Sequence, residues 1–473
     1  MTATLTDAPP RGRGLHLGAA LAVLACAQLI IALDLNIVFV ALPEIGSGLG
    51  FSAATLQWVV GAYTVFTGGF LLLGGRAADL LGRRRVFVFA LVLYAGSSLA
   101  GGLAGAPGVI VAARAVQGIG GALLFPATLS LVTTLFEEGP ARNRALAVWG
   151  GAGASGLSLG ALLGGVLTDA FGWSAVFFVN VPLAGLVALA ALATIPPDGP
   201  RPRGRSFDLP GAATATGGVM ALVFVLVQGP EAGWGATEVV AAAVTAVVLL
   251  GAFAAIETRG ADPLMPPRLL RNRSLLVAMA VTGLYLATFG ALPYFLTVVF
   301  QQVQGMTPLQ TGLAFLVPSL AIAAGTQLGE RMATRAGARL TLAAGFAIGV
   351  PGTALMALAF TAEGSYADVV PGLIVSGVGQ GIAWTAMWIA SSAGVAAREQ
   401  GVASGMASTT FNVGNAVGIA LLVALANRDL DGRAGEALRA ATADGSRTAA
   451  LVATAGLALG VALAFALPRA ARE

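Results

Sequence analysis

Two charged residues inside apolar stretches are the groups in this sequence with the clearest chemical potential. Asp34 lies in an apolar run at about 15–43, and Arg114 lies in another at about 108–135. A charged side chain in the lipid interior is costly unless it is paired or neutralised, and such residues commonly mark ion or substrate pathways. We therefore expect Asp34 to exchange a proton. The alternative is a permanent ion pair with Arg114, and both interpretations hold if substrate or proton breaks the pair.

Enzyme chemistry has little support in the sequence. There is no lysine, and His16 and Cys26 are the single histidine and cysteine, which excludes a His/Cys zinc site and a lysine-dependent phosphate loop. The spacing in Gly151–Gly156 matches a dinucleotide fingerprint, and that in Gly156–Gly160 matches a nucleophile elbow. However, no strand precedes the first, and the histidine lies in the N-terminal tail. Small residues packing helix against helix explain both, so we expect no enzyme, no cofactor and no metal site.

The composition is that of an integral membrane protein. Of the 473 residues, 57% are hydrophobic and 10% are charged, whereas a soluble domain has about 25% charged residues. A helix needs about 20 apolar residues to cross a bilayer. Fourteen runs reach this length, at about 15–43, 53–75, 86–105, 108–135, 142–168, 173–195, 211–229, 236–256, 274–301, 308–330, 339–360, 367–392, 399–426 and 448–467.

The arginines orient these runs. With the N-terminus inside, 21 of the 26 arginines fall in inner loops, four fall in the last outer loop, and Arg114 lies inside a run. Positive residues accumulate on the cytoplasmic side, so we expect a multi-pass plasma-membrane protein with both termini in the cytoplasm. Twelve spans would also be an even number, but the two middle runs are nearly uncharged and are kept. The net charge of +4 does not indicate nucleic acid, because the arginines sit in short loops.

The runs and linkers divide the chain into seven segments. They are a cytoplasmic tail at 1–14, a six-helix bundle at 15–195, a cytoplasmic linker at 196–210, two inserted membrane helices at 211–256, a cytoplasmic linker at 257–273, a second six-helix bundle at 274–467 and a cytoplasmic tail at 468–473. A faint repeat relates 74–84 to 329–339, at equivalent points of the two bundles. Two related halves around a central binding site are a known transporter plan.

A glycine-rich basic loop joins the second and third runs. It contains Gly75, Asp79 and Gly82, followed by Arg83 and Arg84. The glycines permit tight turns, and Asp79 can face the positive N-terminus of another helix. We expect this loop to gate a conformational change. The alternative is a basic loop that only sets topology.

This loop resembles the signature loop of the major facilitator superfamily. In that family the aspartate stabilises packing against the eleventh superfamily helix when the cytoplasmic side is closed. Leu33–Pro43 resembles the first-helix motif of the fourteen-spanner drug:proton antiporters, and Arg114–Gly121 resembles the fourth-helix motif, whose arginine is implicated in proton transfer. A stripe of small residues resembles the antiporter packing motif and consists of Gly156, Gly160, Gly164 and Gly165.

The resemblance implies an all-α integral membrane protein with the major facilitator fold, in which two inserted helices between two six-helix bundles give fourteen spans. It also implies proton-driven export of hydrophobic, drug-like or antibiotic-like compounds by alternating access. We expect a monomer in the lipid bilayer, with the proton as coupling ion. Two alternatives are uptake or facilitated diffusion of a small polar solute by the same fold, and a non-transport role such as a membrane enzyme or receptor. The sequence departs from the family pattern at Leu80, Ala161 and Ser174.

Polar and aromatic side chains inside the runs are candidates for a substrate cavity. Arg114 and Gln117 share one helical face, and Gln380, Trp384 and Trp388 follow each other at intervals of four residues. Such groups also serve as hydrogen bonds between helices. The candidates are Asn36, Trp58, Tyr63, Gln117, Tyr285, Tyr294, Gln380, Trp384, Trp388, Asn412 and Asn415.

Overall fold

The regular structure of the described residues is helical. The computed structural model describes residues 11–51, 53–56, 58–199, 208–259, 265, 269–393, 395–396, 399–428 and 433–468. Parts of the predicted tails at 1–14 and 468–473, and of the predicted linkers at 196–210 and 257–273, lie outside the described residues. The helices are α1 (Arg11–Leu49), α2 (Ala53–Leu56), α3 (Trp58–Leu81), α4 (Arg83–Gly102), α5 (Pro107–Leu135), α6 (Pro140–Phe171), α7 (Ala175–Phe178), α8 (Asn180–Thr194), α9 (Leu209–Ala232), α10 (Thr237–Arg259), η1 (Leu269–Arg271), α11 (Arg273–Thr288), α12 (Leu292–Val298), η2 (Val299–Val303), α13 (Pro308–Ala314), α14 (Leu316–Leu358), α15 (Tyr366–Ser392), α16 (Gln400–Ala426) and α17 (Gly435–Ala464).

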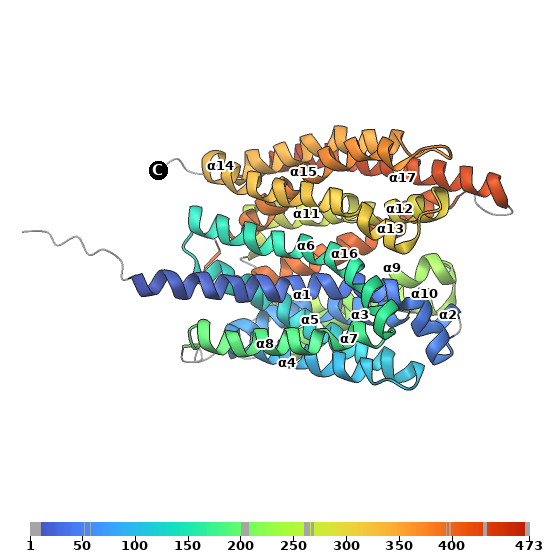
Figure 1. The fold of residues 1–473 in the computed structure, drawn as a ribbon. Helices are drawn as coiled ribbons and strands as arrows, with labels where there is room; N and C mark the ends of the chain where they lie inside the picture. The colour runs from blue at the N-terminus through green and yellow to red at the C-terminus, as the bar shows by residue number, and fades with distance from the viewer. Residues whose placement is uncertain are drawn as a thin grey trace, which may run out of the picture.

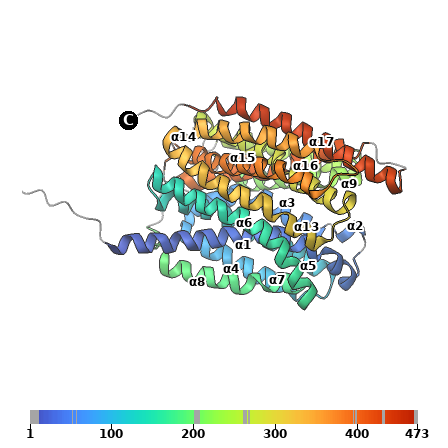
Figure 2. The same ribbon diagram turned by 45° about the horizontal axis from the view of Figure 1, so that its top comes forward.

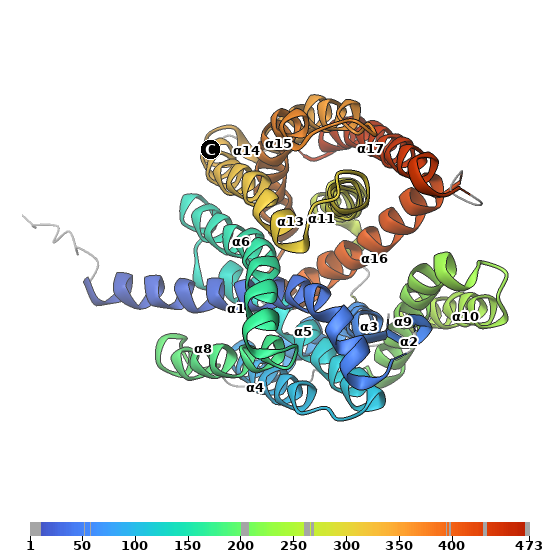
Figure 3. The ribbon, with the colours of Figure 1, turned by 45° about the vertical axis from the view of Figure 1, so that its right-hand side comes forward.

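Two helical halves and an inserted pair form one bundle (Figure 1). The first half runs from α1 to α8, and the second runs from α11 to α17. The helix α1 begins and α17 ends at the same end of the bundle, which we call the proximal end. The helices α6 and α16 lie where the halves meet, because α6 packs on both α1 and α14, and α16 packs on both α3 and α11 (Figures 2 and 3).

The inserted pair, α9 and α10, covers one side of the interface between the two halves. The two helices pack on each other, and α9 also lies against α3 and α16. The Trp58 ring on α3 stacks on the Phe224 ring of α9 with centroids 5.6 Å apart. On α10, the side chains of Val244 and Val247 are exposed. The pair therefore contacts both halves through α9 and presents an apolar surface through α10.

Twelve helical segments of the described chain are long and apolar enough to cross a membrane. The fourteen spans expected from the sequence are therefore not confirmed. One difference is α6, which is 32 residues long but contributes only the short apolar segment Leu162–Phe171. The other is the 50-residue segment Leu309–Leu358, which counts once although Gly337 within it is non-helical, with φ 79° and ψ 162°.

A stripe of glycines on α6 brings it into backbone contact with α1. A Cβ atom added to Gly156, Gly160 or Gly164 would collide with the carbonyl oxygens of Leu29, Leu33 and Ile37, respectively. A Cβ atom on Gly165 would meet nothing within 4 Å, so this residue lies outside the contact. Small residues allow close helix approach where lipid surrounds the protein. The stripe thereby holds the turn of α1 that carries Asp34.

We predict that Gly160→Ala lowers the thermal unfolding midpoint of the purified protein. The added methyl group would press on the Leu33 carbonyl, and overpacking of this kind costs about 1–3 kcal/mol. Gly165→Ala is the matched control, because its methyl group meets open space and alanine favours a helix over glycine. Equal midpoints for the two variants would contradict the close packing of α1 on α6.

Candidate functional site

An ion pair is buried in the first half. The Arg114 Nη1 atom on α5 donates to Asp34 Oδ2 on α1 at 2.6 Å. The exposed fractions of the two side chains are 1% and 0%. Because neither charge reaches solvent, each depends on the other for neutralisation. The sequence placed both charges within apolar runs, and the structure brings them into direct contact.

Amide side chains complete the shell around Asp34. Its Oδ1 atom accepts hydrogen bonds from Gln117 Nε2 at 2.9 Å and from Asn180 Nδ2 at 2.7 Å. Gln117 Nε2 also donates to Ser98 Oγ at 2.8 Å. The carboxylate therefore has three donors from α5 and α8, besides its place on α1. Gln117 was a sequence candidate; Asn180 was missed, and its only signal was a polar residue at the start of an apolar segment.

The Arg114 guanidinium has further partners. Its Nε atom donates to the Val59 carbonyl on α3 at 2.9 Å, and its Nη1 atom donates to Gln117 Oε1 at 2.7 Å. The Tyr63 ring lies 4.4 Å from the guanidinium carbon. These contacts hold the cation even without Asp34. Asp34 is the only anion paired with Arg114 among the described residues.

A second aspartate joins the two halves at the proximal end. Asp79, near the end of α3, accepts hydrogen bonds from the backbone N–H groups of Gly401 and Val402 at 3.1 and 2.9 Å. These residues begin α16, so the carboxylate faces the positive end of that helix. Arg83 Nη2 donates to Asp79 Oδ1 at 2.9 Å. Gly75 allows this approach, because a Cβ atom there would collide with the Gly401 carbonyl.

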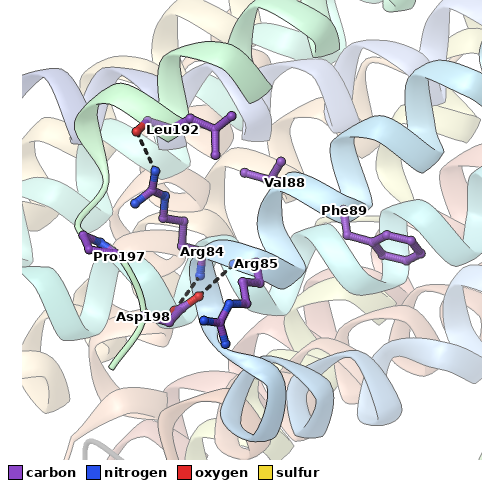
Figure 4. A pocket seen from close by; sticks show the side chains of 7 residues that line it. All are labelled: Arg84, Arg85, Val88, Phe89, Leu192, Pro197 and Asp198. Atoms are coloured by element: carbon purple, nitrogen blue, oxygen red, sulfur yellow. Dashed lines mark hydrogen bonds between the residues drawn. The ribbon is translucent and has the colours of Figure 1, made fainter. Parts of the chain in front are cut away.

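The remaining residues of the basic loop act within the first half. Gly82 has φ 105°, a backbone conformation that favours glycine. The backbone N–H groups of Arg84 and Arg85 each donate to a carboxylate oxygen of Asp198 at 3.0 Å. Arg84 also donates from its side chain to the Leu192 carbonyl. An open pocket of about 390 Å³ lies here and is lined by Arg84, Arg85, Val88, Phe89, Leu192, Pro197 and Asp198 (Figure 4).

An aromatic cluster lies between the halves, closer to the proximal end than Asp34. Phe125 on α5 and Trp149 on α6 meet the rings of Trp384, Trp388 and Phe411 on α15 and α16. The centroid distances across the halves are 5.7 Å for Phe125–Trp388, 5.9 Å for Phe125–Phe411, 6.5 Å for Trp149–Trp384 and 5.6 Å for Trp149–Trp388. Tyr285 adjoins Trp384 at 5.8 Å, and its hydroxyl donates to the Gln380 carbonyl at 3.2 Å. These ring contacts connect the two halves.

The other sequence candidates have different surroundings. Trp58 packs on the inserted helix α9. Tyr294 is 43% exposed and packs on Phe295. Asn412 donates to the Ser408 carbonyl of its own helix at 3.1 Å. Asn36 and Asn415 are partly buried on α1 and α16.

Comparisons with known proteins agree with this architecture. The family model of the Major Facilitator Superfamily matches residues 24–419. The chain is 37% identical over 405 residues to the puromycin resistance protein pur8 of Streptomyces alboniger, covering 85% of this chain and 80% of that one. It is 37% identical over 422 residues to the cephamycin export protein CmcT of Amycolatopsis lactamdurans, covering 88% of this chain and 86% of that one.

Solved structures show the same fold at low sequence identity. The proton:xylose symporter XylE matches with a TM-score of 0.70 and 13% identity, covering 97% of both chains. The human organic anion transporter MFSD10 matches with a TM-score of 0.69 and 18% identity, covering 95% of this chain and 99% of that one. Together with the sequence matches, these show that the chain is a multi-pass membrane protein and belongs to the Major Facilitator Superfamily of transporters.

Proposed function

We propose that this chain exports hydrophobic, antibiotic-like compounds in exchange for protons by alternating access. The observation that carries the proposal is the fully buried ion pair of Asp34 and Arg114 between α1 and α5. The names of the puromycin, cephamycin and lincomycin relatives, which are resistance or export proteins, support the substrate class. The names of these relatives do not state a coupling ion. We infer the proton from the buried ion pair.

The coupling step is a change of charge at Asp34. With Asp34 ionised, the pair is neutral and the cluster is closed by hydrogen bonds from Arg114, Gln117 and Asn180. Uptake of one proton neutralises the carboxylate and leaves one uncompensated positive charge on Arg114. An unpaired charge in this setting is costly, so the protonated cluster favours a rearrangement. Release of the proton restores the pair, and each cycle moves one charge through the site.

The gating step is separation of the halves at the proximal end. We place this end in the cytoplasm, because the sequence assigns 21 of the 26 arginines to the inner loops, and the basic loop with Arg83 and Arg84 lies at this end. The contact of Asp79 with the start of α16, and the ring contacts of Phe125 and Trp149 with α15 and α16, then close the cytoplasmic side in this structure. Opening requires these contacts to break.

We also propose that the chain crosses the membrane fourteen times, as in the fourteen-spanner drug:proton antiporters. At 1.5 Å per residue, the 32 residues of α6 reach about 48 Å, which exceeds the hydrocarbon core. The segment Leu309–Leu358 would reach about 75 Å if straight, and Gly337 lies near its middle. Two crossings joined at Gly337, together with α6, raise twelve spans to fourteen.

Uptake of a small polar solute is the weaker alternative. Such a substrate needs fixed polar or charged groups from both halves of the site. Among the described residues from α11 to α17, the one buried charged side chain is that of Glu399, which precedes α16, and none lies inside these helices. The aromatic surface of Trp384, Trp388 and Phe411 suits an apolar compound better.

We predict that Asp34→Asn abolishes the response of export to a proton gradient, with at least a tenfold loss of gradient-driven puromycin transport in vesicles. The amide keeps the shape of the side chain but cannot take up and release a proton. Asp444→Asn, at an exposed site on α17, is the control and keeps the wild-type response. Normal export by Asp34→Asn with an unchanged response to pH would rule out coupling through this residue.

The double variant Asp34→Asn with Arg114→Gln separates coupling from structure. Loss of both charges avoids an unpaired buried charge, so thermal stability recovers relative to Asp34→Asn alone. Coupling stays absent, because no carboxylate returns. Recovery of gradient-driven export in the double variant would show that the pair has only a structural role.

We predict that Asp79→Ala opens the proximal end. The substitution leaves two N–H groups at the start of α16 and the Arg83 side chain without their carboxylate, a loss of about 1–3 kcal/mol. Spin labels on Ala19→Cys and Arg335→Cys, in a Cys26→Ser background, report the distance between the halves, and longer distances should become populated. Asp198→Ala is the matched control, because Asp198 caps α4 within one half. Identical distance distributions for Asp79→Ala and Asp198→Ala would contradict the gating role.

A further inference from the structure

Three tryptophans of the aromatic cluster carry unused hydrogen-bond donors. The indole Nε1 atoms of Trp149, Trp384 and Trp388 are buried and have no hydrogen-bond partner among the described residues. The side chains of Trp149 and Trp388 are 0% exposed. Buried tryptophans usually find a partner for this N–H group, and an unpaired buried donor destabilises the structure. Three such donors in one cluster therefore indicate a missing acceptor.

The donors come from both halves of the protein. Trp149 lies on α6 in the first half, whereas Trp384 and Trp388 lie on α15 in the second, with ring centroids 6.5 and 5.6 Å from Trp149. A Cβ atom on Gly150 would collide with the Trp384 Nε1 atom, so this glycine allows α15 to approach. When the halves separate at the proximal end, the cluster divides into two aromatic surfaces. Each surface keeps at least one indole donor.

The chemistry of these surfaces defines a ligand. Phe125 and Phe411 add apolar ring faces, which stack on flat apolar molecules. The indole N–H groups donate only, so the ligand must supply acceptor oxygens. The one buried charged side chain described in the second half, Glu399, precedes α16 and is not part of the aromatic cluster, so a formal charge on the ligand is not needed here.

We propose that Trp149, Trp384 and Trp388 select the exported compounds by donating indole hydrogen bonds to acceptor oxygens on a flat, apolar molecule. This inference rests on the proposed export function and names its substrate class. The compound binds between the two surfaces when the proximal end is open. Closure brings the rings together into the space that the compound occupied, and the compound leaves toward the opposite end.

The test uses two probes that share one three-ring frame. Anthraquinone carries two carbonyl oxygens, whereas anthracene carries none. Binding of each probe to the purified full-length protein in detergent is measured by equilibrium dialysis, with protein-free micelles subtracted. The wild-type protein should bind anthraquinone about five- to tenfold more tightly than anthracene, as expected for one or two net hydrogen bonds.

The variants Trp149→Phe, Trp384→Phe and Trp388→Phe remove the donors but keep an aromatic ring. Combined, they should abolish the preference for anthraquinone and change anthracene binding by less than about twofold. The thermal unfolding midpoint should stay equal or rise, because unpaired buried donors are lost. Trp234→Phe, at a residue that is 49% exposed, is the control and should keep the preference.

Three results would overturn the inference. The first is equal or absent binding of the two probes to the wild-type protein. The second is an unchanged preference in the triple variant. The third is a lower unfolding midpoint of the triple variant together with weaker binding of both probes, which would mean that the indole rings serve only in packing. Failure of the export function gives a different result. Gradient-driven transport would then be absent, but the wild-type protein would still prefer anthraquinone and the triple variant would still lack this preference.

Discussion

The cost of a charge in the membrane interior is the constraint on which the rest of the structure depends. Asp34 and Arg114 neutralise each other, and α1, α3, α5 and α8 each contribute a group to this cluster. The glycine stripe on α6 lets α1 approach closely enough to hold Asp34 in place. A single proton changes the charge of the whole cluster. In the proposed mechanism, this change of charge is the step that a proton gradient drives.

Carboxylates at helix N-termini provide the contacts that a conformational change can break or keep. Asp79 receives two backbone N–H groups at the start of α16, in the opposite half. Asp198 receives two at the start of α4, in its own half. The chemistry is the same, but only the first contact must break when the halves part. The aromatic cluster lies on the same side of Asp34 as the Asp79 contact, so a polar and an apolar contact close that end together.

Local features of the sequence were sufficient to predict several residues of the candidate site. Asp34 and Arg114 stand out because charges are rare in apolar runs, and Gln117 follows from helical spacing. The capping role of Asp79 follows from its glycine-rich loop. Asn180, Asp198 and Trp149 could not be predicted, because their partners lie far away in the chain and each resembles an ordinary residue of its segment. The span count differed because the two runs that the sequence separates at 308–330 and 339–360 form one continuous helical segment, and because only Leu162–Phe171 of α6 is a sufficiently apolar stretch.

The resemblance between the halves does not extend to their chemistry. The first half holds the buried pair of Asp34 and Arg114, whereas the second contributes indole and phenyl rings. In the proposed mechanism, an apolar compound and a proton therefore use neighbouring but distinct groups, which are coupled by movement of the halves. The inserted α9 touches both halves through α3 and α16, which places it where that movement occurs.

Proton release on compound binding tests this account most directly. Purified protein in weakly buffered detergent solution would be titrated with puromycin or lincomycin over a range of starting pH, with a pH indicator following released protons. The titration of each compound alone is subtracted. The account predicts that binding releases protons in the pH range where Asp34 is protonated in the free protein. Saturable binding with no proton release at any starting pH would contradict it.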